Sequence, residues 1–180
     1  VKDVPALGYA QFYIRVKEEP VKTEVKQDQL PTQTVENDWY RIEFNPSKGT
    51  IKQLFDKELD CNILTPDAEW EMGEFIYEII DSRHPMEQYK APKFLRRRPE
   101  RIRFEAFESG DIWDTYRFRG ETVAGREPNN LMVEYRIFKV EKKIEVVYRL
   151  RKNAVIDPES IYISFPFEIA GGKIHLDVPG

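Results

Sequence analysis

The sequence predicts an all-β protein, an antiparallel β-sandwich, and three observations lead to this prediction. Apolar side chains recur at every second position in most apolar stretches, which is the period of a strand. Aromatic residues make up 13% of the 180 residues, in a chain with 12 prolines, and this combination favours strands over helices. Turn-forming residues separate the stretches at short intervals, as in sandwiches and barrels. We therefore expect helices in less than about a fifth of the chain.

The first 35 residues divide into two parts. In residues 1–16, apolar groups stand at near-alternate positions from 4 to 16, so we predict a terminal strand of a preceding small β-domain. Residues 17–35 are polar, with two prolines and no large aromatic side chain. Such a composition is typical of a linker or a long exposed loop. The sandwich itself is then expected to span residues 36–180 and to continue beyond them.

The stretch ENDWYRIEFNPSKGTIKQLFDKEL, residues 36–59, predicts a hairpin followed by a second turn. Three alternating side chains share one face of its first strand: Tyr40, Ile42 and Phe44. The turn over 45–49 combines Pro46, whose ring fixes φ, with Gly49, which can adopt a positive φ. The return strand is expected over 51–55, and residues 56–58 turn the chain again.

Two further hairpins are predicted downstream of a strand over 73–81. The hairpin over 101–120 turns at about 108–111, and its apolar face is expected to hold Ile102, Phe104, Ala106, Ile112, Tyr116 and Phe118. The hairpin over 130–152 turns at 140–143 and sets one apolar row against another: Leu131, Val133, Tyr135 and Ile137 against Ile144, Val146, Tyr148 and Leu150. Strands over 160–169 and 173–178 complete the series. The apolar residues of 85–98 recur with neither the period of a strand nor that of a helix, so the sequence does not assign this segment to either.

Composition excludes several function classes. The net charge of −4 argues against a nucleic-acid partner, since such proteins are more often basic. One cysteine, Cys61, and two histidines far apart in the chain make a closed zinc site improbable, so no metal or cofactor is expected here. No apolar run reaches about 18 residues, so no membrane-spanning helix is predicted and no membrane partner is expected. No glycine-rich phosphate-binding motif occurs.

The segment 90–103 carries seven Lys or Arg residues and one acid, Glu100. Such a run invites a phosphate or nucleic-acid interpretation. Prolines frame the segment, however, and aromatic residues do not alternate with the cations as they do on a base-stacking surface. A solvated loop or an interdomain contact is the favoured interpretation.

The strongest candidates for a carbohydrate contact surround Trp113, which Asp111 and Asp114 flank in the stretch GDIWDTY. Strand alternation places Trp113 on the face opposite Tyr116. An indole can cover the apolar C–H groups of a sugar while carboxylates accept hydrogen bonds from the sugar's hydroxyl groups. Alternatively, Trp113 packs under a loop or against another domain, because tryptophan is largely buried on average. Two further candidates are Tyr77, in the strand over 73–81, and His84, in a loop. No catalytic residue is evident.

Four segments resemble α-mannosidases of glycoside hydrolase family 38, in the order that the family has them. VPALGYAQFYI (4–14) resembles a segment near the end of a small β-domain. VENDWYRIEFNPSKGTIKQLFDKEL (35–59) is similar to the signature that opens the family's large β-sandwich. GEFIYEII (73–80) and ESIYISFPFEIAGGKIHLDVPG (159–180) resemble later parts of that sandwich.

The resemblance implies a galactose-mutarotase-like supersandwich. In the family, the catalytic carboxylates and the zinc ligands lie in an N-terminal α/β barrel, to which nothing in this sequence corresponds. No catalytic residue or metal ligand therefore transfers to this chain. We expect a non-catalytic domain that packs on the catalytic domain of the same, longer polypeptide and lines its sugar cleft. A free-standing carbohydrate-binding module, a mutarotase-like epimerase and a structural interaction sandwich remain alternatives.

Overall fold

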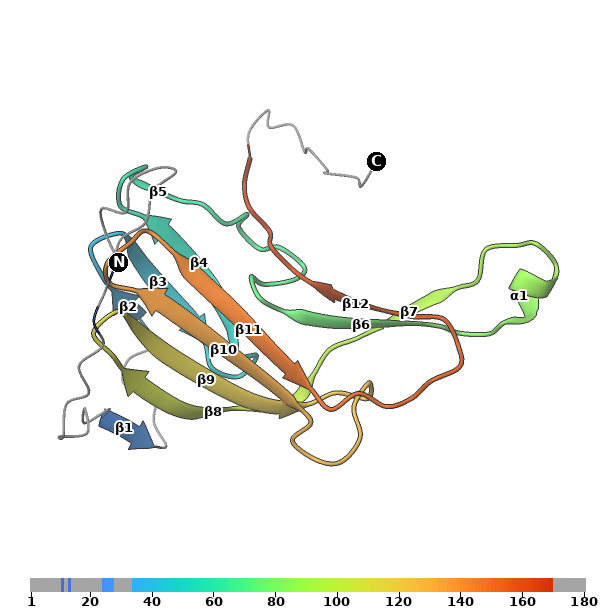
Figure 1. Cartoon of the computed structure of the whole chain (residues 1–180). Helices are drawn as coiled ribbons and strands as arrows, with labels where there is room; N and C mark the ends of the chain where they lie inside the picture. Colours follow the sequence, from blue (N-terminus) through green and yellow to red (C-terminus); the bar gives the residue numbers. More distant parts are fainter. Residues whose placement is uncertain (1–10, 12, 14–23, 28–33, 170–180) are drawn as a thin grey trace.

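Three antiparallel sheets form the protein, which is therefore an all-β sandwich as predicted (Figure 1). The structure is a computed structural model that describes residues 11, 13, 24–27 and 34–169. The sheets have five, four and three strands, and every strand pairs with its neighbours in the antiparallel sense.

The five-stranded sheet has the order β1-β8-β9-β10-β11. Its strands are β1 (Glu24–Gln27), β8 (Glu100–Ser109), β9 (Trp113–Glu121), β10 (Leu131–Phe138) and β11 (Ile144–Leu150). Both predicted hairpins lie in it, as β8–β9 and β10–β11. The two predicted apolar rows of the second hairpin face each other residue by residue, with pairs such as Val133 with Tyr148 and Tyr135 with Val146.

Strand β8 differs from the prediction because it contains irregularities in its pairing with β9. The register shifts between Phe104 and Ala106, so Phe104 pairs with Phe118 and Phe107 pairs with Tyr116. An extra residue in one strand reverses the faces that follow it. Ala106 therefore lies on the face opposite the core, and Phe107 takes the core-facing position that was predicted for Ala106. Ile112 was also wrongly placed: it precedes β9 and is 49% exposed.

The four-stranded sheet has the order β2-β3-β4-β5 and contains the first predicted hairpin. Its strands are β2 (Thr34–Glu36), β3 (Tyr40–Asn45), β4 (Thr50–Asp56) and β5 (Cys61–Asn62). Gly49 adopts φ +64° at the turn, as expected, and its amide donates to the Asn45 carbonyl at 2.8 Å. The Asp56 carboxylate then organises the next turn by accepting the amides of Glu58 and Leu59 at 3.0 and 3.1 Å.

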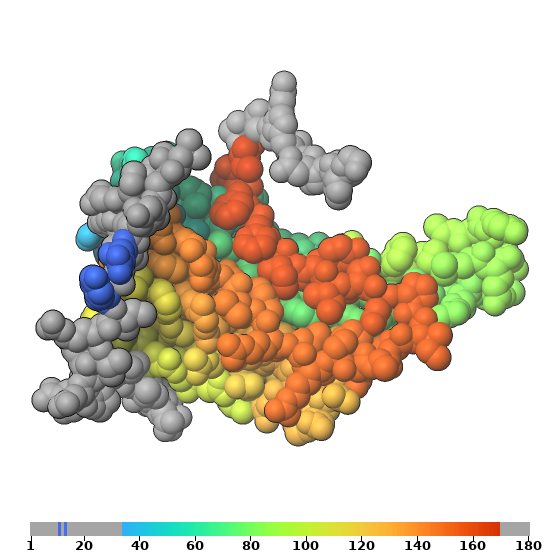
Figure 2. Space-filling model, viewed as in Figure 1, coloured from blue at the N-terminus to red at the C-terminus, as the bar shows by residue number. Residues whose placement is uncertain are grey.

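The three-stranded sheet has the order β12-β6-β7, with β6 (Phe75–Ile80), β7 (Phe94–Arg97) and β12 (Glu159–Ile163). Between β6 and β7 the chain leaves the sandwich as an arm, residues 81–93, which carries α1 (His84–Glu87) and projects from the molecule (Figures 1 and 2). The stretch 85–98 thus holds part of a helix and a strand. Among the described residues, no helix has both the length and the apolar character needed to cross a membrane.

The core lies where the sheets face one another. The Phe44 ring of β3 contacts the rings of Tyr116, Phe118 and Tyr135, with centroids 5.1, 5.8 and 5.3 Å away. Side chains of this kind each contribute about 1.5–3 kcal/mol through burial. Two hydroxyl groups join the sheets by donating to glycine carbonyls: Tyr135 to Gly49 at 2.9 Å and Tyr148 to Gly73 at 2.6 Å.

The segment predicted as a linker, 17–35, contributes strands to the sandwich. Its residues 24–27 form β1 on the outer edge of β8, and β2 begins within it at Thr34. A polar segment can form an edge strand because pairing at the edge of a sheet uses the backbone N–H and C=O groups and does not require apolar side chains. The linker prediction considered side-chain polarity only and did not include these two strands, and residues 17–23 and 28–33 lie outside the described residues. Most of the predicted strand over 4–16, and the predicted strand over 173–178, lie outside the described residues.

Candidate functional site

Trp113 begins β9 and lies on the outer face of the five-stranded sheet, opposite Tyr116 as predicted. Its cross-strand partner is Phe138, whose ring centroid is 5.2 Å from the indole. The Arg136 guanidinium lies 5.6 Å from the ring centroid, a cation–π distance. The indole is half-buried, so neighbours on β10 already cover part of it.

Trp113 also lines a pocket of about 300 Å³ at the β8–β9 turn. Asp111 lines the same pocket, so the structure brings these two predicted residues together. Asp114 has another role. Its carboxylate accepts a hydrogen bond from Ser109 Oγ at 2.7 Å and pairs with Lys139 Nζ at 2.8 Å. Asp114 therefore fixes the turn and does not line the pocket.

The structure does not bring His84 or Tyr77 to Trp113. His84 is exposed on the arm, where its Nε2 lies 3.0 Å from Gln88 Nε2. Tyr77 is 3% exposed in β6, and its hydroxyl donates to the Glu159 carboxylate. Burial, together with this hydrogen bond, raises the pKa of Tyr77 to about 12. Because its ring is buried, Tyr77 cannot stack on a sugar and is not a carbohydrate contact.

The basic run over 90–103 is not a continuous loop, since it contains β7 and the start of β8. Three of its arginines are neutralised by glutamates, in the pairs Arg96–Glu78, Arg98–Glu74 and Arg101–Glu121 at 2.8, 3.1 and 3.0 Å. Three of the seven cations of the run are thus neutralised locally, which weakens the phosphate interpretation.

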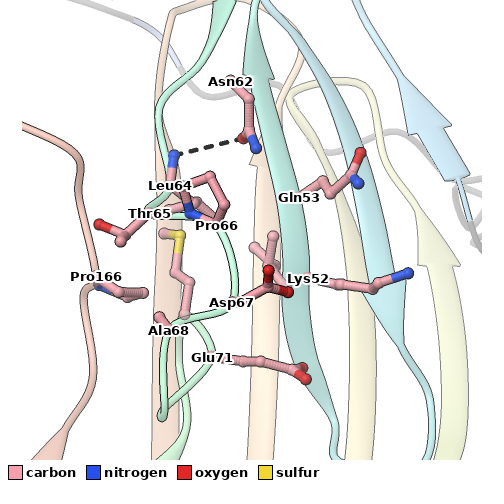
Figure 3. A pocket seen from close by; sticks show the side chains of 12 residues that line it. Lys52, Gln53, Asn62, Leu64, Thr65, Pro66, Asp67, Ala68, Glu71 and Pro166 are labelled. Atoms are coloured by element: carbon pink, nitrogen blue, oxygen red, sulfur yellow. Dashed lines mark hydrogen bonds between the residues drawn. The ribbon is translucent and has the colours of Figure 1, made fainter.

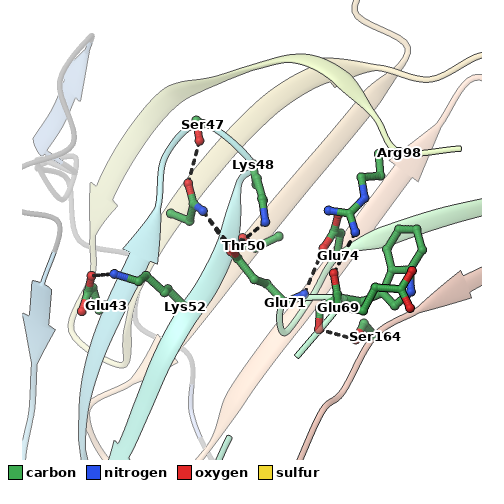
Figure 4. Close-up of polar contacts among 12 residues, drawn as sticks. Glu43, Ser47, Lys48, Thr50, Lys52, Glu69, Glu71, Glu74, Arg98 and Ser164 are labelled. Atoms are coloured by element: carbon green, nitrogen blue, oxygen red, sulfur yellow. Dashed lines mark hydrogen bonds and ion pairs between the residues drawn. The ribbon is translucent and has the colours of Figure 1, made fainter. Parts of the chain in front are cut away.

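A polar cluster that the sequence did not reveal surrounds Glu71 and Glu74, just before β6 (Figure 4). The Glu71 carboxylate accepts hydrogen bonds from Lys48 Nζ at 2.6 Å, Thr50 Oγ1 at 2.5 Å and Asn45 Nδ2 at 3.0 Å. The Glu71 amide donates to Glu74 Oε2 at 2.9 Å. The cluster clamps the β3–β4 turn to the segment that leads into β6.

Glu71 and Glu74 are acidic groups held by cations. Burial alone would raise the pKa of Glu71, but the hydrogen bonds from Lys48, Thr50 and Asn45 outweigh it and hold the pKa below its ordinary value. The Glu74 side chain is 3% exposed and pairs with Arg98, whose guanidinium stacks 4.1 Å from the Trp70 ring centroid. The only sequence signal for this cluster is the group of four acids in the stretch DAEWEMGE (67–74), and it does not indicate which cations pair with them.

Each described carboxyl group with a shifted pKa has its pKa shifted downward. In the described part of the chain, the pKa lies below its ordinary value for Glu36, Asp56, Glu71, Glu134, Glu145 and Glu159. A carboxylic acid that donates a proton near neutral pH needs a raised pKa. None of these six groups is prepared for that role. The described residues also contain no group of three His, Cys, Asp or Glu side chains placed to hold a metal ion.

Comparison with known proteins adds no family assignment to this geometry. No protein-family model matches the chain, and no curated protein matches it.

Proposed function

We propose that this chain is a non-catalytic β-sandwich domain, of the galactose-mutarotase-like supersandwich type, that packs on the catalytic domain of an α-mannosidase-type glycoside hydrolase. The observation that carries the proposal is an exposed apolar surface on and after β12, which we call the β12 surface. Its side chains are 40–65% exposed: Ile161, Tyr162, Phe165, Phe167 and Ile169.

The β12 surface has the properties of a protein interface. In the described part of the chain, β12 pairs on one side only, with β6. An open edge with large apolar side chains is a ready site for a further protein segment. The rings of Phe165 and Phe167 stack with centroids 6.2 Å apart, so they present one continuous apolar area.

The type of partner rests on the sequence resemblance in segments 4–14, 35–59, 73–80 and 159–180. The six described carboxyl groups whose pKa is lowered are not suited to act as general acids, which supports a non-catalytic role. In this proposal, the reaction and the zinc ion belong to the partner domain, and the sandwich supplies a wall beside it.

Hydrogen exchange tests the proposal. Backbone amides of β12 and residues 165–169 should exchange at least about tenfold more slowly in the full-length polypeptide than in this chain alone. Amides of β10 should exchange equally in both, which provides the internal control. Equal exchange at β12 would refute the docking surface. Turnover of an aryl mannoside by this chain alone, abolished by changing one of its acids, would refute the non-catalytic role.

A second function, carbohydrate binding, is favoured by the pocket that Trp113 and Asp111 share. The indole would cover the C–H face of a sugar and the Asp111 carboxylate would accept hydrogen bonds from its hydroxyl groups. The double variant Trp39→Phe, Trp70→Phe isolates the fluorescence of Trp113. A saturable change on adding a soluble oligosaccharide would support this function, and an unchanged spectrum would reject it.

A further inference from the structure

A second pocket, of about 410 Å³, lies between β4 and the segment 62–72 (Figure 3). Its volume is within the range of small-molecule sites, roughly 300–1,000 Å³. Three apolar side chains line its inner side and are buried, with exposures of 0, 2 and 4%: Ile51, Leu64 and Met72. Pro66 and Pro166 add two rigid apolar rings. The pocket thus offers an apolar surface that can contact several carbon atoms of a ligand.

Backbone hydrogen bonds hold the walls of this pocket together. The Ile51 amide donates to the Met72 carbonyl at 3.0 Å, and the Ile63 amide donates to the Leu54 carbonyl at 3.0 Å. The Thr65 amide donates to the Pro166 carbonyl at 2.8 Å, which joins the segment to the chain after β12. The pocket is therefore formed before any ligand arrives, which lowers the entropic cost of binding.

Several polar groups of the lining have hydrogen-bonding capacity to spare. Among the described residues, the side chains of Gln53, Thr65 and Asp67 have no polar partner. Asn62 uses Oδ1 to accept the Leu54 and Leu64 amides, which leaves its Nδ2 group free to donate. The pocket therefore combines a carboxylate acceptor with amide donors and a hydroxyl group.

The charges around the pocket leave one carboxylate uncompensated. Glu71 is bound by Lys48, and Lys52 is bound by Glu43 at 2.9 Å. In the described part of the chain, Asp67 has no such counter-ion. An anion would be repelled by Asp67, and the described residues offer no cluster for a metal ion. A simple cation would leave the amide donors of Gln53 and Asn62 unused.

We propose that this pocket binds a neutral, hydroxyl-rich molecule of the size of one sugar ring. Asp67 accepts hydrogen bonds from its hydroxyl groups, Gln53 and Asn62 donate to its oxygens, and the floor of Ile51, Leu64 and Met72 contacts its C–H face. This site goes beyond the docking role, which needs no ligand, and it is separate from the pocket of Trp113.

Two-dimensional amide NMR of this chain, titrated with neutral methyl glycosides to about 50 mM, tests the proposal. We expect saturable shifts at Thr65, Asp67 and the Gln53 side-chain amide. A ring with about a dozen heavy atoms should bind with a dissociation constant on the order of 1–10 mM. Inorganic phosphate and methylammonium chloride, as charged probes, should shift these signals at least about tenfold less effectively.

Asp67→Asn is the decisive variant. Asp67 has φ +52°, and asparagine tolerates this left-handed conformation, so the backbone should be retained. Replacing the charged acceptor should weaken binding about tenfold or more. Asp60→Asn, a change of the same kind at an exposed residue with φ +54° that does not line the pocket, should leave binding unchanged.

Three results would overturn the site: no saturable shift at these residues, an Asp67→Asn variant that binds normally, or shifts that move to Trp113 instead. The NMR experiment uses this chain alone. A negative result would therefore not affect the hydrogen-exchange test of the docking role, which compares this chain with the full-length polypeptide.

Discussion

Strands β10 and β12 have similar apolar composition but opposite environments. Every residue of β10 is buried except Arg136, whereas no residue of β12 is buried. The difference is position: β10 lies between β9 and β11, and β12 lies at the edge of its sheet in the described structure. Apolar alternation therefore predicts that a strand forms, and the number of neighbouring elements decides whether it is buried.

Both faces of β10 are occupied. On the core face, Tyr135 is 0% exposed and contacts Phe44 and Phe118. On the outer face, the Glu134 carboxylate lies between Arg117 and Arg136, with both Arg Nε–Oε distances close to 3.0 Å. On β12, by contrast, the exposed side chains have the character of a surface that another domain would cover.

A pair of tyrosine variants gives the largest expected contrast between these strands. Tyr135→Ala should lower the free energy of unfolding by about 3–5 kcal/mol, because it empties a packed aromatic site. Tyr162→Ala on β12, where the side chain is 48% exposed, should cost less than about 1 kcal/mol. Urea unfolding at neutral pH measures both. Losses of equal size would mean that β12 is as well packed as β10 and would remove the reason for a docking surface.

Acid titration provides a second, smaller contrast. Burial opposes ionisation of Glu134, but hydrogen bonds from Arg117 and Arg136 outweigh it and lower its pKa. Such a group stabilises the fold fully above its unfolded pKa, and this contribution is lost as pH falls through the lowered folded pKa. At pH 7, Glu134→Gln should cost about 2 kcal/mol, and its deficit relative to the unmodified chain should shrink below about pH 4.5.

The matched variant for this test is Glu159→Gln on β12. Lys152 and Tyr77 lower the pKa of Glu159 through hydrogen bonds, but its side chain is 21% exposed, against 4% for Glu134. We expect a smaller loss of stability, since solvent screens the more exposed pair. A pH-independent deficit for Glu134→Gln in urea unfolding would show that packing, rather than charge, is its contribution.

The smallest effect is expected on the arm that joins β6 to β7. Tyr89 is 101% exposed and has φ +55°, a conformation that asparagine adopts more readily. Tyr89→Asn should change the free energy of unfolding by no more than about 0.5 kcal/mol. A loss above about 1 kcal/mol by thermal or urea unfolding would mean that the ring contacts the sandwich, and the arm would then not be an independent projection.

Local patterns predicted the hairpins, because each depends on residues close together in the chain. The turn at Gly49 and the pairing of Val133 with Tyr148 follow from turn chemistry and strand alternation alone. The reversal at Ala106 could not be predicted, since a register shift in β8 leaves the composition of the strand unchanged.

The candidate sites were predicted less well, because they depend on contacts between distant segments. Asp111 and Trp113 are two positions apart at the β8–β9 turn, so their proximity could be predicted locally. Tyr77 was misplaced because its burial depends on β12, and its hydroxyl partner Glu159 is 82 positions away. Lys48 and Thr50 reach Glu71 across 23 and 21 positions, so no local motif marks that cluster or the pocket beside it.

The two tyrosine hydroxyl bonds between the sheets have a consequence for folding kinetics. They join residues 86 and 75 positions apart, Tyr135 to Gly49 and Tyr148 to Gly73. Contacts between such distant segments must wait for large loops to close, so we expect refolding on the millisecond-to-second scale of non-local β-proteins. The hairpins should form first and the sheets should dock afterwards. At Gly73, an added Cβ would lie 2.3 Å from the Tyr135 hydroxyl. Gly73→Ala should therefore accelerate unfolding and leave the refolding rate nearly unchanged, as expected where contacts form after the transition state.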